Sequence, residues 1–217
     1  MEPAVYPPIY RILKTVAFTV GLLLLIYLIK NRNLAEVASE DGLLTTISIV
    51  LLSSTGILCL VRAMGIKYYQ WLFWLSAVGL IFMAFDDALR LHEGMDKAIH
   101  AGLDIDESPI SDKLDALIVI LYFIAGLIML YCARGLIWQY PMSIAMFFIA
   151  GVFAVVMLTF DIMTIGWTFN VLGITMDTRF TEDAAKVISE YFVLLAVVET
   201  FSKEPQDIVG LHDSTTT

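Results

Sequence analysis

The stretch LLTTISIVLLSSTGILCLV, residues 43–61, contains no charged side chain in 19 consecutive positions. A bilayer core about 30 Å thick needs about 20 apolar residues in a helix, because lipid offers no partner to an unpaired backbone amide. Residues 68–85, 116–133 and 142–160 are also free of charge. The sequence therefore predicts an all-α fold, a polytopic membrane helix bundle.

The overall composition supports the same class. Apolar residues make up 59% of the 217 residues and charged residues 16%, against roughly 45–50% and 25% in soluble domains. A net charge of −9 leaves no broad basic surface for a nucleic acid. The two cysteines, Cys59 and Cys132, lie inside apolar stretches and do not indicate a disulfide framework. Soluble enzymes, secreted disulfide scaffolds, disordered chains and nucleic-acid partners are excluded.

Two further segments complete a prediction of six transmembrane helices, with five or seven as less favoured counts. Residues 12–29 contain Lys14, and because basic residues follow at once without a small-residue cleavage site, we expect a transmembrane helix and not a signal peptide. The last segment carries Lys186, Glu190 and Glu199. The predicted domain, residues 1–203, has helices at about 12–29, 43–61, 68–90, 116–133, 142–163 and 184–201, followed by a polar tail at 204–217 that we expect to be disordered.

Six helices place both termini on one side of the membrane. With the N-terminus inside, six Lys and Arg residues are cytoplasmic and five are not, a small difference in the direction of the positive-inside rule. We therefore expect a multi-pass protein of the cell (plasma or inner) membrane with cytoplasmic termini. Its certain partner is the lipid bilayer; partner membrane subunits or a homo-oligomer remain open.

Two helical hairpins resemble each other and suggest a duplication. The first reads GILCLVRAMGIKYY from Gly56 and ends at Phe85-Asp86; the second reads GLIMLYCARGLIWQY from Gly126 and ends at Phe160-Asp161. Duplicated hairpins are common in membrane proteins. A chance likeness between two apolar hairpins is the alternative.

Ionisable groups inside a transmembrane helix cost roughly 2.5–3.5 kcal/mol and therefore indicate function. Asp161 is the only charged residue between positions 135 and 176. Glu190 lies within the last helix, where a local ladder of pairs with Lys186 is the alternative. Glu199, near the far end of that helix, is expected to reach water.

The segment FDDALRLHE, residues 85–93, is the richest in polar chemistry. At 100° per residue Asp86, Arg90 and Glu93 share one helix face, with Asp87 and His92 on its flanks. The alternative is an ordinary solvated helix end in which Arg90 neutralises the acids.

The six-helix topology brings these groups to one end of the bundle, where they must bind a cation, share protons or pair with Arg90 and Lys186. Many carboxylates and one imidazole suit a divalent ion such as Zn²⁺, Mn²⁺, Fe²⁺ or Ca²⁺. The predicted metal ligands are Asp86, His92, Glu93, Asp161 and Asp183. The predicted catalytic residues are Glu190 and Asp87.

Two short motifs, FDDALRLHE and EDAAK at residues 182–186, resemble those of a set of bacterial multipass membrane proteins. That set has an Asp-acid pair with a downstream His-Glu and a later acid-acid-x-x-Lys motif. The resemblance implies a site but no particular chemistry. The matching positions are Asp86, Asp87, His92, Glu93, Glu182, Asp183 and Lys186.

Three functions fit these features. The first is a metal-dependent membrane enzyme that acts on a lipid or another amphiphile, with the ion activating water. The second is a non-catalytic subunit of a membrane complex. The third is a proton- or cation-coupled transporter, which the nearly uncharged inner halves of the helices disfavour. The sequence alone leaves enzymatic activity undecided.

Overall fold

A computed structural model represents the chain and describes residues 8–30, 42–65, 69–91, 114–163, 168–171 and 174–202, with a few positions between 94 and 102. Apart from one β-hairpin, its elements are helices. The larger ones are α1 (Pro8–Lys30), α3 (Leu43–Gly65), α4 (Gln70–Leu89), α6 (Leu114–Cys132), α8 (Pro141–Met163) and α9 (Thr178–Glu199). The smaller elements are α7 (Arg134–Ile137), a 3-10 turn η2 (Thr200–Ser202), and strands β1 (Thr168–Val171) and β2 (Ile174–Asp177).

Each range predicted to be a transmembrane helix holds a helix, because an uninterrupted apolar stretch without Pro can satisfy its backbone only in this way. α8 begins at Pro141, where the missing N–H removes no helical hydrogen bond. α9 begins at Thr178, six residues before the predicted start, so Glu182 and Asp183 lie inside the helix. The predicted tail, residues 204–217, lies outside the described residues.

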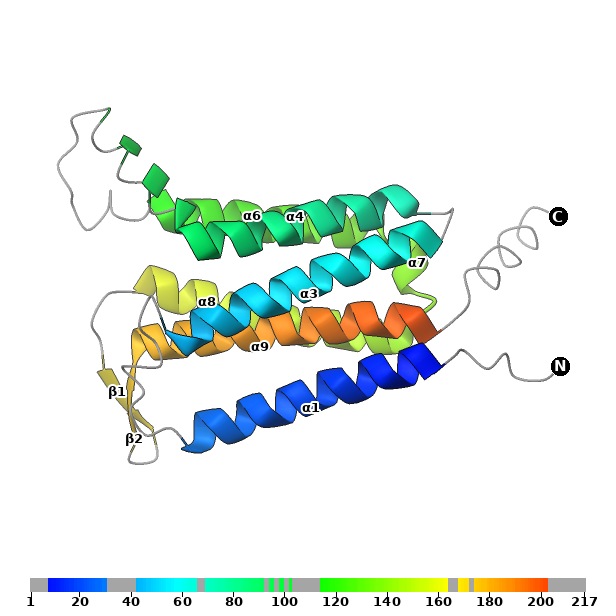
Figure 1. Ribbon diagram of the computed structural model, residues 1–217. Coiled ribbons are helices and arrows are strands. Elements are labelled where there is room, and N and C mark those ends of the chain that lie inside the picture. Colours follow the sequence, from blue (N-terminus) through cyan, green and yellow to red (C-terminus); the bar gives the residue numbers. More distant parts are fainter. Residues whose placement is uncertain are drawn as a thin grey trace, which may run out of the picture.

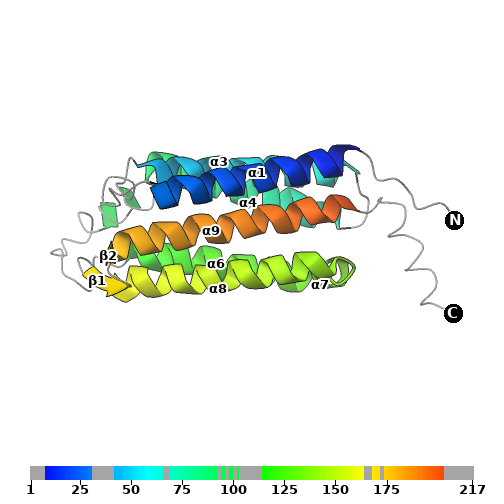
Figure 2. The same ribbon diagram turned by 90° about the horizontal axis from the view of Figure 1, so that it is seen from below.

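The six long helices run along one common axis, and α9 lies in the middle of the bundle (Figures 1 and 2). α9 packs on α8, α3 and α1, while α3 and α4 form a close pair. The short α7 joins α6 to α8 at one end of the bundle. At the other end lies the antiparallel hairpin, in which Thr168 pairs with Asp177 and Val171 with Ile174. The sequence did not predict these strands.

Two apolar clusters meet on α9 and hold the bundle together. One joins α3, α4 and α9 through residues that include Cys59, Ala77 and Val197. The other joins α1, α3 and α9 and includes Leu51 and Leu194. Because α9 contributes to both clusters, two of its acidic side chains, Glu190 and Glu199, are buried between neighbouring helices.

The outside of the bundle is apolar. Within the part of the chain that the structure describes, three helical segments are long and apolar enough to cross a membrane: Leu43–Gly65, Gln70–Leu89 and Pro141–Asp161. In α6 the apolar segment Leu117–Cys132 is shorter. Large apolar side chains such as Phe18, Val78 and Phe148 are exposed on the outer faces. A bundle with such a surface is consistent with a membrane protein.

Candidate functional site

Glu190 lies in the interior of the bundle, where a hydroxyl group connects it to α4. Glu190 is buried halfway along α9 and faces Ser48 of α3. The Ser48 hydroxyl oxygen lies 2.8 Å from Glu190 Oε1 and 2.7 Å from Asp87 Oδ2. The two residues predicted to be catalytic are therefore brought together from different helices by a serine.

The Ser48 hydroxyl has one hydrogen and stands between two carboxyl oxygens. It can donate to only one of them, and must accept a hydrogen bond from the other. One of the two carboxyl groups therefore carries a proton, because two ionised carboxylates would leave one close contact between acceptors. The other Glu190 oxygen, Oε2, is buried and has no hydrogen-bond partner among the described residues.

Lys186 indicates which carboxyl group donates to Ser48. Its Nζ donates to Asp87 Oδ1 at 2.6 Å, and the Asp87 side chain is only 10% exposed. Because Asp87 already accepts a hydrogen bond from the Lys186 ammonium group, the arrangement favours Glu190 as the carboxyl group that donates to the Ser48 oxygen. The resulting chain of hydrogen bonds runs from Glu190 through Ser48 to Asp87. The ion pair of Lys186 thus crosses from α9 to α4, and the local ladder within α9 does not describe it.

Asp86 lies beside this series of hydrogen bonds and is not part of it. It is buried, and its Oδ2 accepts a hydrogen bond from the Tyr122 hydroxyl of α6 at 3.2 Å. Asp86 and Asp87 are consecutive residues in the last turn of α4, so their side chains point about 100° apart around the helix. The Asp-Asp pair therefore links α4 to α6 through one residue and to α3 and α9 through the other.

The other predicted metal ligands are spread over the same end of the bundle. Asp183 lies two turns before Glu190 on α9, within electrostatic range of both Lys186 and Glu190. Asp161 is partly buried near the end of α8. His92 and Glu93 lie outside the described residues. Among the residues that the structure describes, no three His, Cys, Asp or Glu side chains gather closely enough to hold a metal ion.

The predicted continuous helix face from Asp86 to Arg90 is wrong, and Glu93, its third member, lies outside the described residues. α4 ends at Leu89, and Arg90 takes the left-handed conformation with φ 51° and ψ 45°. Its backbone N–H donates to the Asp86 carbonyl and closes the helix end. The predicted helix boundary at about residue 90 agrees with this end, but the spacing of the charged residues did not indicate that Arg90 is left-handed, because no Gly or Pro stands there.

Sequence reasoning missed Ser48 and Tyr122. A serine in an apolar helix attracts no attention, because its hydroxyl can bond to its own backbone. Tyr122 offered a better signal: tyrosines of membrane helices usually lie at the interfaces, whereas Tyr122 lies well inside its apolar stretch. A partly buried hydroxyl at such a depth needs a polar partner, and Asp86 supplies it.

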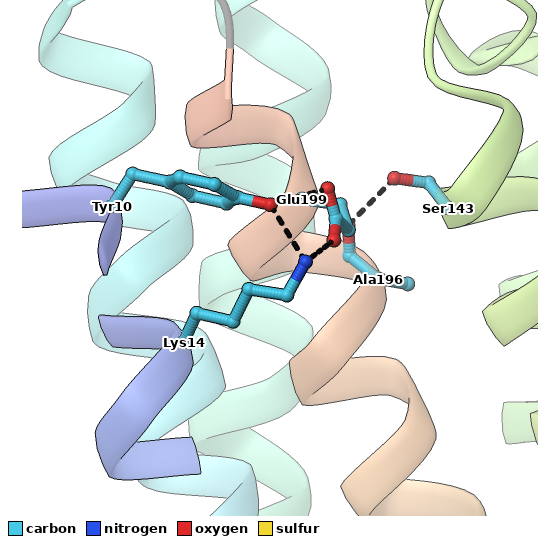
Figure 3. Close-up of polar contacts among 5 residues, drawn as sticks. All are labelled: Tyr10, Lys14, Ser143, Ala196 and Glu199. Atoms are coloured by element: carbon cyan, nitrogen blue, oxygen red, sulfur yellow. Dashed lines mark hydrogen bonds and ion pairs between the residues drawn. The ribbon is translucent and has the colours of Figure 1, made fainter. Parts of the chain in front are cut away.

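A second polar cluster joins α1 to α9 at the opposite end of the bundle (Figure 3). The Tyr10 hydroxyl donates to Glu199 Oε2 at 2.9 Å, and Lys14 Nζ donates to Glu199 Oε1 at 2.8 Å. Glu199 is buried, so the expectation that it reaches water is wrong. In the same view Ser143 of α8 donates to the Ala196 carbonyl at 2.9 Å.

The two polar clusters are separated by an apolar layer. Glu190 and Glu199 are nine residues apart, or about 14 Å along α9 at 1.5 Å per residue. Between them α9 buries Leu194, Val197 and Val198. The Glu190 group and the Glu199 group are therefore two distinct sites on the same helix.

Comparison with known proteins gives one match. No curated protein and no solved structure matches the chain. A family model described as a domain of unknown function (DUF8692) matches residues 12–200, a range that covers most of each long helix and the Glu190 group, and that includes Lys14 and Glu199 of the second cluster but not Tyr10. The chain belongs to this family.

Proposed function

We propose that the protein is an integral membrane enzyme that transfers a proton to or from a lipid or another amphiphile, with Glu190 as its acid or base. The observation that carries this proposal is the single Ser48 hydroxyl between Glu190 and Asp87, which requires a bound proton. Two carboxyl groups held in different states by their surroundings are the usual arrangement for acid–base chemistry. Two of the residues, Asp87 and Lys186, belong to the two short motifs that resemble those of bacterial multipass membrane proteins.

Each residue of this group has a distinct role in the proposed step. Glu190 gives the proton on Oε1 to the substrate, or takes one there, and Oε2, which has no hydrogen-bond partner among the described residues, accepts a hydrogen bond from the substrate. When Glu190 becomes a carboxylate, the Ser48 hydroxyl turns from Asp87 to Glu190 and donates to it. Lys186 stays paired with Asp87 throughout. The proton lost in one cycle returns to Glu190 from water.

The apolar layer favours an enzyme over a transporter. A carrier needs polar groups along a path between the two faces, whereas Leu194, Val197 and Val198 are buried between the two clusters of α9. A proton at Glu190 therefore enters and leaves through the same end. This one-sided access suits chemistry on a bound substrate.

The finer membrane topology is part of the same proposal. All six long helices cross the bilayer, and both termini are cytoplasmic. The contact of Lys14 with Glu199 supports this topology, because it places the start of α1 and the end of α9 at one end of the bundle. The catalytic group then lies nearer the outer surface.

A divalent metal ion is a separate proposal, because the described carboxylates form no metal-binding group. The ion would be held by His92 and Glu93 together with Asp86, Asp161 and Asp183. Elemental analysis of detergent-purified protein, beside an Asp161→Ala, Glu93→Ala double variant, tests it. Stoichiometric metal that is lost in the variant supports the metal-dependent form. Metal-free, active protein contradicts it.

The bound proton can be measured directly by infrared difference spectroscopy. At neutral pH the wild-type protein should show the carbonyl band of a protonated carboxylic acid, and Glu190→Gln should remove it. Ser48→Ala should move the band, because the acid loses its acceptor. Glu199→Gln is the matched control, a buried carboxyl on the same helix, and should leave the band in place. Absence of the band from folded wild-type protein would contradict the proposal.

Catalysis is tested on a total lipid extract from membranes. Lipids incubated with wild-type protein are compared by mass spectrometry with lipids incubated with Glu190→Gln or Asp87→Asn. We expect a change in one lipid class that Glu199→Gln retains and the two site variants lose. If the band is present and no lipid changes, the proton site stands and the lipid substrate is refuted.

A further inference from the structure

An apolar groove lies between α6 and α8. Its volume is about 690 Å³, within the roughly 300–1,000 Å³ of small-molecule sites. Its walls are large apolar side chains, among them Phe123, Leu127 and Leu130 of α6 and Phe147, Phe148 and Val152 of α8. The groove exists because α6 and α8 touch at few points, in contrast to the close pair α3–α4.

A positively charged side chain, that of Arg134, lies at an end of this groove. Arg134 of α7 contributes to its lining, together with Trp138. The guanidinium group lies over the Tyr131 ring, 4.2 Å from its centroid, and Nη1 donates to the Tyr131 carbonyl at 3.1 Å. Within the part of the chain that the structure describes, Arg134 has no acidic partner. Its remaining N–H groups are available to an anion.

We propose that this groove binds an anionic phospholipid, with an acyl chain between α6 and α8 and the phosphate on Arg134. The groove opens on the lipid-facing side, where Phe148 and Trp138 are each 73% exposed. A planar guanidinium group matches the oxygens of a phosphate in a forked contact. Basic pockets between membrane helices on the cytoplasmic side bind such headgroups.

Phospholipid suits the groove better than a protein helix does. A helix that docks on another in a membrane needs small residues on the facing surface, so that the two backbones can approach. Here Gly151 is the one glycine in the lining, and the rest of the wall is mostly Phe, Leu, Ile and Val. A flexible acyl chain fills such a narrow space without close backbone contact. The inference rests on the membrane placement proposed above, but not on proton chemistry at Glu190.

Trp138 gives the test its probe. A variant with Trp71, Trp74 and Trp167 replaced by Phe keeps Trp138 as the only tryptophan. It is placed in phosphatidylcholine vesicles in which a rising fraction of the lipid carries brominated acyl chains, which quench a tryptophan that they touch. The brominated lipid is either phosphatidylglycerol or phosphatidylcholine. We expect brominated phosphatidylglycerol to half-quench Trp138 at a several-fold lower fraction than brominated phosphatidylcholine.

Variants of the groove separate the headgroup from the chain. Arg134→Gln should abolish the preference for phosphatidylglycerol, and Arg134→Lys should keep part of it, because the charge remains and the fork is lost. Gly151→Leu fills the groove and should reduce quenching by both lipids. Gly126→Leu is the control: it adds the same side chain on α6 at a position that does not line the groove and where a Cβ meets nothing within 4 Å.

Three results would overturn the inference. Equal quenching by the two lipids, or a preference that survives Arg134→Gln, would exclude an anionic headgroup site. Protection of Trp138 that grows with protein concentration would mean that a second copy of the chain covers the groove. Glu190→Gln should leave the lipid preference intact, so failure of the proton site and failure of the lipid site can be told apart.

Discussion

In the hairpin α3–α4, a Cβ placed on Gly56 would lie 2.7 Å from Ile81 Cγ1, whereas at Gly126, its counterpart in the hairpin α6–α8, a Cβ would meet nothing within 4 Å. The two hairpins have similar sequences, yet the first is a close pair and the second encloses a groove. Close packing of α3 on α4 thus depends on a glycine, Gly56, that faces the partner helix. Two hairpins of similar hydropathy can therefore differ in how closely their helices pack.

The polar residues of the site separate the two hairpins further. Asp86 has a counterpart in Asp161, but Ser48 and Asp87 correspond to Ile118 and Ile162. The proton site therefore uses residues that the first hairpin has and the second lacks. The proposed proton site and the proposed lipid groove therefore lie in different hairpins, although the sequences of the two hairpins are alike.

Removing the cation from the close hairpin should have the largest effect on stability. Lys186→Met leaves Asp87 buried without its partner, and breaking a buried pair costs about 3–5 kcal/mol. Because the Lys186 side chain is 29% exposed, we expect a loss of about 2–3 kcal/mol in the free energy of unfolding, below the range for fully buried pairs. Unfolding in mixed detergent micelles, followed by circular dichroism, measures it.

Lys14→Met is the matched control for this change. Its pair with Glu199 has similar geometry, but the Lys14 side chain is 54% exposed, so the loss should stay at about 1 kcal/mol or less. Adding Asp87→Asn to Lys186→Met should recover part of the stability, since the unpaired charge of Asp87 is then removed. Equal losses in the two lysine variants would show that Asp87 is better hydrated than its burial indicates.

The glycine pair tests the packing difference directly. Gly56→Leu forces a side chain against Ile81 and the Ala77 carbonyl, and overpacking of this kind costs about 1–3 kcal/mol. Gly126→Leu meets no such obstacle. Both variants gain similar helix propensity, so that contribution cancels in the comparison. We expect Gly56→Leu to be less stable than Gly126→Leu by about 2 kcal/mol in the same unfolding assay.

Equal stability of the two glycine variants would mean that α3 and α4 separate easily. The close pair would then differ from the open pair only in its side chains. The two hairpins would in that case also be alike in how easily their helices move apart.

Hydropathy was sufficient to predict where the long helices lie, because the cost of burying unpaired backbone groups in lipid leaves few alternatives. Hydropathy could not distinguish the closely packed hairpin from the hairpin with the groove. A helix of the first, α4, and a helix of the second, α6, are both apolar around most of their surface. The β-hairpin also went unpredicted, since two four-residue strands in a short connection carry little periodicity. Three of the helices meet the length and hydropathy criteria of a membrane crossing.

The site could be predicted in part, because buried charge is rare and conspicuous in an apolar chain. Glu190 and Asp87 were found in this way, and the structure brings them together. Ser48 was not found, because a hydroxyl group in an apolar helix costs little and is common. The partner of Lys186 also depended on the packing of α4 against α9, which spacing along one helix cannot reveal.

The smallest of the expected effects concerns the faces of α8. Ser143 is buried and donates to the Ala196 carbonyl of α9 at 2.9 Å, whereas Thr159 is exposed and donates to the Val155 carbonyl of its own helix. Ser143→Ala should cost about 1 kcal/mol. Thr159→Ala should stay within about 0.5 kcal/mol.

These two variants show which neighbour determines the position of α8. If Ser143→Ala loses stability and also strengthens quenching of Trp138 by brominated lipid, then contact with α9 controls the width of the groove. If Ser143→Ala changes the stability but not the quenching, the apolar side chains of α6 and α8 determine the width of the groove. A Thr159→Ala variant less stable than Ser143→Ala would contradict the packing of α8 on α9, and with it the contrast between the close and the open hairpin.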